Sequence, residues 1–267
     1  MEIVEVPAKI FLIGEYLVLE GGDAVLEAIR PGYRFVFGEG IADALPHPES
    51  PAGMLLKEAS AESVRFRLLA GSSPAGFGGS TAECLMAWKQ VHGVWPDPEE
   101  IHLWYRRHVP RASGADLLLQ ARKTGTARIG SPPRVYERMH LLERLLPSKQ
   151  PTHLDLALER SPIRSQVLSS LVARFRSQVI EPVEGGFGVL GEFAEELHQT
   201  GRETEDARQI RKSLQSIEGV EGVKGCGAGL HDQFLMVLSP GVSATSVSPA
   251  VEQVGLRFRA SLAECVW

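Results

Sequence analysis

The residues best suited to chemistry form a short glycine-rich loop over residues 76–81. An alternating, strand-like stretch (63–69) precedes it, and a helical pattern begins at about residue 81. Glycine lets backbone N–H groups approach a phosphate closely, and the N-terminus of a following helix adds partial positive charge. The pattern predicts an anion site, although a strand-to-helix turn without a ligand has the same composition. The loop consists of Gly76, Phe77, Gly78, Gly79, Ser80 and Thr81.

Two charged residues outside the loop, Lys9 and Asp116, could take part in the same chemistry. Lys9 interrupts an apolar stretch, so it is either an edge residue that reaches solvent or a charge placed for function. Asp116 follows the turn Ser113-Gly114 at the expected start of a helix, where acidic residues are common because they complement the helix dipole. Taken one at a time, these residues leave both interpretations open.

A second glycine cluster contains Gly227 and Gly229 and precedes an apolar strand. Its composition predicts a backbone turn. Lys224, just before the cluster, could approach phosphates, but a lysine before a glycine turn is expected to be exposed. His231 and Asp232 lack partners at a metal-binding spacing, so we assign them no role.

Around these residues, strand-like and helix-like segments are intermixed along the chain, which predicts an α+β fold. Glycines, prolines and a weak hydrophobic pattern over 123–135 place a boundary there, so we expect domains at 1–135 and 136–267. The mixed-sign run from Arg202 to Lys212 is typical of a solvated helix face. Strands are expected at 3–6, 28–37, 63–69, 152–158, 234–238 and 256–263, with a further extended piece at 17–19. Helices are expected at about 54–61, 81–92, 98–107, 165–179, 188–200, 204–217 and 247–254.

The bulk composition is that of an ordinary globular protein. The chain has 267 residues, of which 43% are hydrophobic and 23% charged, and its formal net charge is -5. This charge argues against a broad nucleic-acid surface but is compatible with a small basic pocket. Three widely spaced cysteines form neither a disulfide framework nor a metal spacing, which favours a reducing cytoplasm. The apolar run 10–19 is interrupted by Gly14-Glu15 and predicts neither a signal peptide nor a membrane span.

Three motifs occur in a fixed order: the stretch from Pro7 to Leu19, the glycine loop, and Lys224-Gly225-Cys226-Gly227-Ala228-Gly229. Together they resemble the small-molecule kinase family named for galactokinase, homoserine kinase, mevalonate kinase and phosphomevalonate kinase. Residues 76–82, Gly-Phe-Gly-Gly-Ser-Thr-Ala, stand where that family usually has Gly-Leu-Gly-Ser-Ser-Ala-Ala. Ser113-Gly114-Ala115-Asp116 also resembles the segment with the catalytic aspartate of mevalonate and phosphomevalonate kinases. The likeness spans residues 5–238.

The resemblance implies a two-domain kinase fold, with an N-terminal domain like ribosomal protein S5 domain 2, a C-terminal ferredoxin-like domain, and ATP and Mg²⁺ as cofactors. Phosphoryl transfer needs phosphates held in line and an acceptor hydroxyl relieved of its proton. Asp116 would accept that proton, and Lys9 would stabilise the alkoxide or keep Asp116 ionised. Glu15 and Arg111 are candidates for binding the substrate. The phosphates of ATP would be bound by Gly76, Gly78, Gly79, Ser80, Thr81, Gly227 and Gly229, with Ser80 also a Mg²⁺ ligand.

Mevalonate is the expected acceptor, because Lys9 with Asp116 favours the mevalonate branch over homoserine kinase, which as a family lacks that base. Phosphomevalonate kinase resembles the same motifs and is the alternative. Gly79 replaces the first serine of the loop and the chain is short, which leaves a non-catalytic nucleotide- or ligand-binding relative as a further alternative. Leu230-His231 also depart from the family pattern, which has small residues there.

A hydrolase is disfavoured because the sequence lacks the His-Glu-x-x-His and Gly-x-Ser-x-Gly patterns. We therefore expect a cytoplasmic protein, monomeric or homodimeric, whose partners are ATP and a small-molecule acceptor. No nucleic-acid or membrane partner is expected. The apolar C-terminal end, Cys265-Val266-Trp267, is expected either in an interface or in the core.

Overall fold

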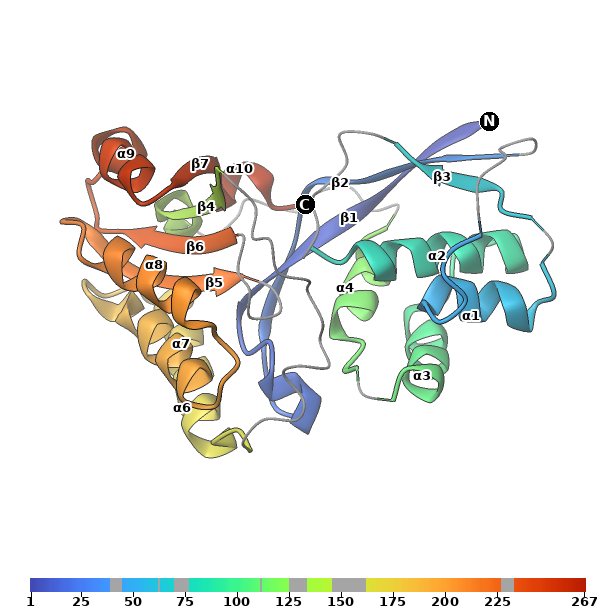
Figure 1. Cartoon of the computed structure of the whole chain (residues 1–267), viewed down its shortest axis with the longest axis horizontal. Helices are drawn as coiled ribbons and strands as arrows, with labels where there is room; N and C mark the ends of the chain where they lie inside the picture. Colours follow the sequence, from blue (N-terminus) through green and yellow to red (C-terminus); the bar gives the residue numbers. More distant parts are fainter. Residues whose placement is uncertain are drawn as a thin grey trace. The chain divides into compact units, whose positions relative to one another are not determined.

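The computed structural model describes residues 1–38, 45–61, 63–69, 77–110, 112–124, 134–145, 162–226 and 233–267. Helices and strands are intermixed along the chain in an α+β fold, which confirms the predicted class (Figure 1). By its internal contacts the chain divides into two compact units. The predicted domain limits, 1–135 and 136–267, stay a prediction. The first unit comprises residues 1–10, 26–129 and 267, and the second comprises residues 11–25 and 130–266.

The first unit is built on a three-stranded sheet in the order β1–β2–β3. β1 spans Glu2–Ile13, β2 spans Val25–Phe37 and β3 spans Phe66–Leu68. β2 and β3 are antiparallel, with Phe35 opposite Leu68. Figure 1 shows the helices of this unit gathered on one side of the sheet. These helices are α1 (Pro51–Glu58), α2 (Gly79–His92), α3 (Pro98–His108) and α4 (Ala115–Lys123).

In the described part of the first unit, the helix starts are of two kinds. α1 follows Ser50 and α3 follows Asp97, and both side chains accept hydrogen bonds from backbone N–H groups of the first turn. α2 and α4 instead follow Gly78 and Gly114, which adopt the left-handed conformation and have no side chain with which to cap a helix. The two glycine starts coincide with the predicted phosphate loop and with the predicted catalytic aspartate.

The second unit contains a four-stranded antiparallel sheet in the order β5–β6–β4–β7. Along the chain, helices separate β4 from β5 and β6 from β7, which is the split β-α-β-β-α-β arrangement of a ferredoxin-like fold. An apolar core joins this sheet to α8 and α9 and includes Leu142, Leu214, Phe234 and Val251. The strands are β4 (Met139–Arg144), β5 (Val220–Cys226), β6 (Gln233–Leu238) and β7 (Leu256–Ser261). The main helices are α6 (Ser165–Ile180), α7 (Val189–Gln199), α8 (Glu205–Gln215) and α9 (Ala244–Gln253).

One predicted element is wrong and another lies outside the described residues. The extended piece at 17–19 is a 3-10 helix, η1 (Leu17–Glu20), because the chain leaves β1 at Gly14 in a left-handed conformation, with φ of +94°. A Cβ at Gly14 would lie 2.7 Å from the Cα of Ala24, so only glycine allows this close turn. The predicted strand at 152–158 is outside the described residues. The remaining short helices are η2 (Arg134–Arg138), η3 (Gly186–Gly188) and α10 (Leu262–Cys265).

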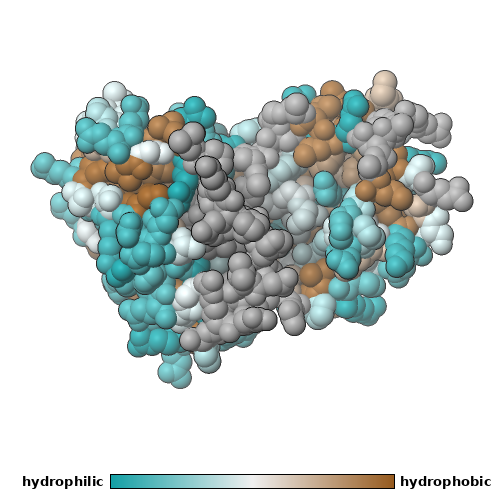
Figure 2. Space-filling view, viewed as in Figure 1, coloured by the Kyte–Doolittle hydropathy of each residue, from teal (hydrophilic) through white to brown (hydrophobic). Residues whose placement is uncertain are grey.

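The mixed-sign run around α8 is only partly the solvated face that its sequence predicts. Hydrophilic residues do cover the side of the second unit where α6, α7 and α8 lie (Figure 2). Glu203 and Arg211 are nevertheless buried, at 2% and 1% exposure, and their side chains form an ion pair at 2.7 Å. Arg211 also binds Glu195, which lies 3.0 Å away. The charge pattern therefore encodes a buried network together with a solvated face, because burial is tolerated when each charge has a partner.

The C-terminal residue belongs to the core of the first unit. Trp267 is buried, and its backbone N–H donates to the carbonyl oxygen of Ala28 at 2.7 Å. The guanidinium group of Arg30 lies 4.5 Å from the centre of the Trp267 ring. Of the two positions expected for this end, the structure shows the core. Within the described part of the chain, we find no helix of the length and apolarity that a membrane span requires.

Candidate phosphate-loop site

Lys9 is a buried residue in the middle of β1. Its residue exposure is 8%, so the interpretation of Lys9 as an edge residue that reaches solvent is wrong. Its backbone N–H donates to the carbonyl oxygen of Phe77 at 2.9 Å, which ties β1 to the glycine loop. Its Cγ lies 3.1 Å from the position that a Cβ would occupy on Gly78. Lys9 therefore packs directly against the loop that precedes α2.

The glycine loop leads into the N-terminus of the 14-residue helix α2. The first N–H groups of a helix have no partner within the helix, and Gly78 supplies no side-chain cap to them. Ser80 is exposed in this first turn. Thr81 is buried, and its hydroxyl lies 2.9 Å from the carbonyl oxygen of Gly78. A bound anion would thus be reached by the hydroxyl of Ser80, whereas Thr81 has only its backbone N–H to offer.

Asp116 is the second residue of α4, at the helix start that its sequence predicts. One carboxylate oxygen accepts from the backbone N–H of Leu117 at 3.0 Å. Burial raises the pKa of Cys84 and the pKa of Tyr105, and the negative charge of Asp116 raises both further. Both groups consequently stay protonated and neutral near Asp116, and neither competes with Asp116 as a base.

The turn before Asp116 is held by α3. The Nε2 atom of His102 lies 3.0 Å from the carbonyl oxygen of Ser113. A Cβ on Gly114 would come within 2.6 Å of the His102 ring, and φ at Gly114 is +70°. Only glycine fits this position, so the Ser-Gly turn has one tightly packed geometry from which α4 and Asp116 start.

Gln120 is a residue of this region that the sequence did not single out. It follows Asp116 by four residues on α4, is fully buried, and bonds to both β1 and the glycine loop. The available signal was its position as the polar residue that ends the run Leu117-Leu118-Leu119. The spacing of four places it on the same helix face as Asp116.

Glu15 and Lys224 form a buried ion pair in the second unit. Their charged atoms lie 2.9 Å apart, and the side chains are 7% and 1% exposed. The expectation that Lys224 is exposed is therefore wrong. Burial opposes the charge on Lys224, but the carboxylate of Glu15 together with Cys226 and Glu203 outweighs this cost, so the pKa of Lys224 lies above its ordinary value. The Lys224 ammonium also donates to the carbonyl oxygen of Phe11 at 3.3 Å.

Several predicted site residues lie outside the described residues: Gly76, Arg111, Gly227 and Gly229. Where the structure describes the chain, no group of three or more His, Cys, Asp or Glu side chains could hold a metal ion. The role of Ser80 as a Mg²⁺ ligand stays a prediction. Of the predicted site residues, the structure brings Lys9, Gly78 and Thr81 together, and Gln120 joins them from the helix of Asp116.

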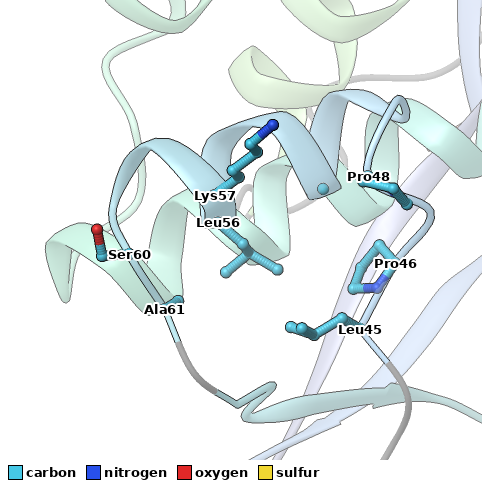
Figure 3. Close-up of a pocket in the computed structure, with 8 residues that line it drawn as sticks. Leu45, Pro46, Pro48, Leu56, Lys57, Ser60 and Ala61 are labelled. Carbon is cyan, nitrogen blue, oxygen red and sulfur yellow. The ribbon is translucent and has the colours of Figure 1, made fainter.

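A separate groove of about 510 Å³ lies beside α1 (Figure 3). Leu45, Pro46 and Leu56 are among its mainly apolar lining residues, and Lys57 is the charged residue among them. None of the predicted site residues lines this groove. The described residues that line it include no carboxylate, so they supply no general base for phosphoryl transfer.

Comparison with solved structures places the whole chain in one fold. Streptococcus pneumoniae phosphomevalonate kinase in complex with phosphomevalonate and AMPPNP has a TM-score of 0.69 at 14% identity, covering 97% of this chain and 99% of that one. Lactococcus lactis galactokinase complexed with galactose has a TM-score of 0.68 at 13% identity, with 97% and 92% covered. Methanococcus jannaschii mevalonate kinase has a TM-score of 0.63 at 14% identity, with 97% and 98% covered. No protein-family model and no curated protein sequence matches the chain.

These likenesses confirm the fold that the sequence motifs implied. The chain has the two-domain α+β fold of the galactokinase, homoserine kinase, mevalonate kinase and phosphomevalonate kinase family. Structures from three branches of the family match at TM-scores between 0.63 and 0.69, so the fold does not select one substrate.

Proposed function

We propose that the chain is an ATP-dependent small-molecule kinase that transfers the γ-phosphoryl group of ATP to an alcohol. One observation carries this proposal: in the first unit, Lys9, Gly78 and Gln120 meet at the N-terminus of α2, and Gln120 is one turn after Asp116. A helix N-terminus, a buried cation and a carboxylate are the groups that phosphoryl transfer uses. The kinase fold of the solved relatives is consistent with it.

The phosphates of ATP would lie against the first turn of α2. The backbone N–H groups of residues 79–81 point out of the helix end, where the dipole favours negative charge. Ser80 would add its exposed hydroxyl to a phosphate or to Mg²⁺. Bound Mg²⁺ would neutralise charge on the phosphates. Gly76, Gly227 and Gly229 complete the proposed phosphate contacts.

Asp116 is the proposed general base. It would orient the acceptor hydroxyl and take up its proton as the O–P bond forms. Lys9 would stabilise the alkoxide that develops, and its burial strengthens that electrostatic effect because little water screens the charge. Cys84 and Tyr105 keep their protons near Asp116, which leaves the carboxylate as the group able to accept one.

Mevalonate is our first candidate acceptor and phosphomevalonate the second, because the segment from Ser113 to Asp116 resembles both enzymes. Arg111 is proposed to bind the acidic group of the acceptor. Glu15 is proposed to shape the acceptor pocket while it is held by Lys224. We further propose that the protein is cytoplasmic, acts as a monomer or homodimer, and has ATP and a small-molecule acceptor as its partners.

The test is an ATP-consumption assay of the purified full chain with mevalonate, phosphomevalonate, homoserine and galactose. We expect turnover with one acceptor, and a loss of about 10²–10⁴-fold in kcat for Asp116→Asn. Asparagine keeps an oxygen that can accept from the N–H of Leu117, so the helix start should be preserved. Asp97→Asn is the matched control, since Asp97 is also an acid at a helix start and asparagine caps equally well.

Three outcomes separate the alternatives. Turnover that Asp116→Asn leaves at the wild-type level would refute the general-base role. Binding of AMPPNP without turnover of any acceptor would favour a non-catalytic nucleotide-binding protein, the reading that Gly79 supports. A loss of activity that is equal in Asp97→Asn and Asp116→Asn would point to helix stability in place of chemistry.

A further inference from the structure

Gln120 connects three segments of the first unit that are far apart in the sequence. Its side-chain N–H groups donate to the carbonyl oxygen of Pro7 at 2.7 Å and to that of Gly78 at 3.1 Å. Its side-chain oxygen accepts from the hydroxyl of Thr81. The first of these partners is on β1, the second precedes α2, and the third is in the first turn of α2. The residue is 0% exposed, so none of these bonds competes with water.

The three bonds match the capacity of an amide side chain. A glutamine has two N–H donors and one carbonyl oxygen, and at this position each N–H has a backbone carbonyl and the oxygen has a hydroxyl. A carboxylate of the same shape would face the two carbonyls with no proton to donate. An apolar side chain would leave the carbonyl of Pro7 without this donor in a buried site, which is costly.

The same side chain limits the conformation of the glycine loop. Gly78 has φ of +94°, and a Cβ on it would lie 3.0 Å from the Gln120 amide nitrogen and 3.1 Å from the Lys9 side chain. The backbone N–H of Lys9 is bonded to Phe77 at 2.9 Å, so the strand holds the loop from the other side. Gly78 is thereby enclosed between β1 and α4, and the direction of the first N–H groups of α2 is fixed.

We propose that Gln120 is a positioning residue of the phosphate loop: it holds the start of α2 against the strand that carries Lys9 and the helix that carries Asp116. This inference rests on the proposed function for its catalytic consequence. The structural part of the inference, that the buried amide of Gln120 holds the glycine loop, does not depend on which acceptor is phosphorylated. Gln120 does not itself touch the reacting atoms.

The decisive variants are Gln120→Met and Gln120→Glu, with Gln90→Met as the matched control. Gln90 also links α2 to backbone, because its side chain accepts from the N–H of Arg65 and donates to the carbonyl of Ser63, both at 2.7 Å. Gln90 lies near the C-terminal end of α2. Its substitution by methionine also removes side-chain hydrogen bonds to backbone groups. AMPPNP binding by calorimetry and hydrogen exchange of the peptide over 77–82 are measured for each variant at a temperature where all are folded.

Gln120→Met should weaken AMPPNP binding by about 10- to 100-fold and raise exchange over 77–82 by a similar factor, because a buried carbonyl loses its donor. The KM for the acceptor should change by less than about threefold while kcat falls, since the altered contacts belong to the ATP loop. Gln90→Met should leave all these quantities near the wild-type values.

Gln120→Glu provides a second test, the pH dependence of AMPPNP affinity. A residue that only stabilises the fold would not change this pH dependence. Burial raises the pKa of a glutamic acid, and its protonated form can donate one hydrogen bond. AMPPNP affinity of this variant, relative to wild type at each pH, should therefore recover several-fold as the pH is lowered from about 8 to about 6. Recovery of this kind supports donation to Pro7 or Gly78.

The proposal is overturned if the hydrogen-exchange rate of the peptide over 77–82 is the same in Gln120→Met as in the wild type. It is also overturned if Gln90→Met and Gln120→Met weaken AMPPNP binding equally. The proposed function fails separately, when the wild type phosphorylates none of the acceptors. In that case the exchange measurement still decides whether Gln120 holds the loop.

Discussion

The ammonium group of Lys224 lies 2.9 Å from the carboxylate of Glu15, and both side chains are buried. Each charge depends on the other, because an unpaired ion in a protein interior loses its hydration without compensation. Glu15 follows Gly14, where the chain turns out of β1, and Lys224 is on β5. The pair therefore fixes the segment after β1 to the sheet of the second unit.

Removing one partner should be more harmful than removing both. We expect Lys224→Met or Glu15→Gln to lower the free energy of unfolding by about 3–5 kcal/mol, because a buried charge is left unpaired. The double variant should recover part of that loss. Urea-induced unfolding of the four proteins in a double-mutant cycle measures the coupling energy.

The exposed pair Arg174–Glu192 is the control for this cycle. Its side chains are 53% and 51% exposed, and its atoms are 2.7 Å apart. A cycle of Arg174→Met and Glu192→Gln should give a coupling of less than about 1 kcal/mol. Equal coupling energies for the two pairs would contradict the importance of burial for Lys224 and Glu15.

Gly78→Ala tests how tightly the start of α2 is enclosed. The free energy of unfolding of this variant should fall by about 2–4 kcal/mol. Alanine is strained at φ of +94°, and its Cβ would lie only 3.0–3.2 Å from Gln120, Lys9 and Thr81. Gly93→Ala is its match at the other end of the helix. There φ is +75° and nothing lies within 4 Å of the new Cβ, so only about 1 kcal/mol of backbone strain is expected.

Thermal unfolding of the two alanine variants and their affinity for AMPPNP give the comparison. Gly78→Ala should lose both stability and nucleotide affinity, whereas Gly93→Ala should lose a little stability alone. If the two variants are destabilised by the same amount, the space around Gly78 relaxes easily and the loop is not rigidly enclosed.

Local signals predicted most of the secondary structure correctly. The start of α3 was readable because Asp97 and Pro98 are a helix cap and a first helical residue, and the structure shows Asp97 accepting from two backbone N–H groups. Asp116 was placed at its helix start by the Ser-Gly turn. The prediction of an extended piece at 17–19 is wrong because a short apolar run fits a strand or a helical turn equally well.

Contacts between distant segments could not be read in the same way. Gln120 bonds to Pro7 across 113 positions, and no periodicity in the sequence relates the two. The sequence predicts an exposed Lys224 because its partner, Glu15, belongs to a different motif. Single-sequence patterns record which face of an element is apolar, but the partner of a buried polar group depends on how elements far apart in the chain pack.

Acid sensitivity is expected from the network between α7 and α8. Hydrogen bonds from Arg208, and then from Arg211, hold the pKa of Glu195 at about 2, below its ordinary value. A carboxylate with a lowered pKa adds stability above its unfolded pKa, and that contribution is lost as the pH falls toward 2. Glu195→Gln should therefore lower the free energy of unfolding by about 1 kcal/mol near neutral pH, where solvent screening reduces the effect, and by clearly less at about pH 2.5.

Chemical denaturation from about pH 7 to about pH 2.5 measures this difference. Glu184→Gln serves as the control because Glu184 is an exposed carboxylate of the same unit. A difference in the free energy of unfolding between Glu195→Gln and wild type that stays constant over this pH range would contradict the lowered pKa of Glu195.

Gly79→Ser restores the serine that the resembling kinases usually have in the loop. A Cβ at Gly79 would lie 3.4–3.6 Å from the ring and hydroxyl of Tyr33, which is an ordinary contact, so packing does not require glycine here. We expect the free energy of unfolding to change by less than about 1 kcal/mol, since serine is the better helix former.

If the loop binds phosphate, the added hydroxyl of Gly79→Ser should tighten AMPPNP binding by up to about tenfold, which is the effect expected of one additional hydrogen bond. Calorimetry on Gly79→Ser and on the reciprocal variant Ser80→Ala, which should weaken binding, provides the measurement. AMPPNP affinity that is unchanged in both variants would show that hydroxyl groups of this loop do not reach the phosphates.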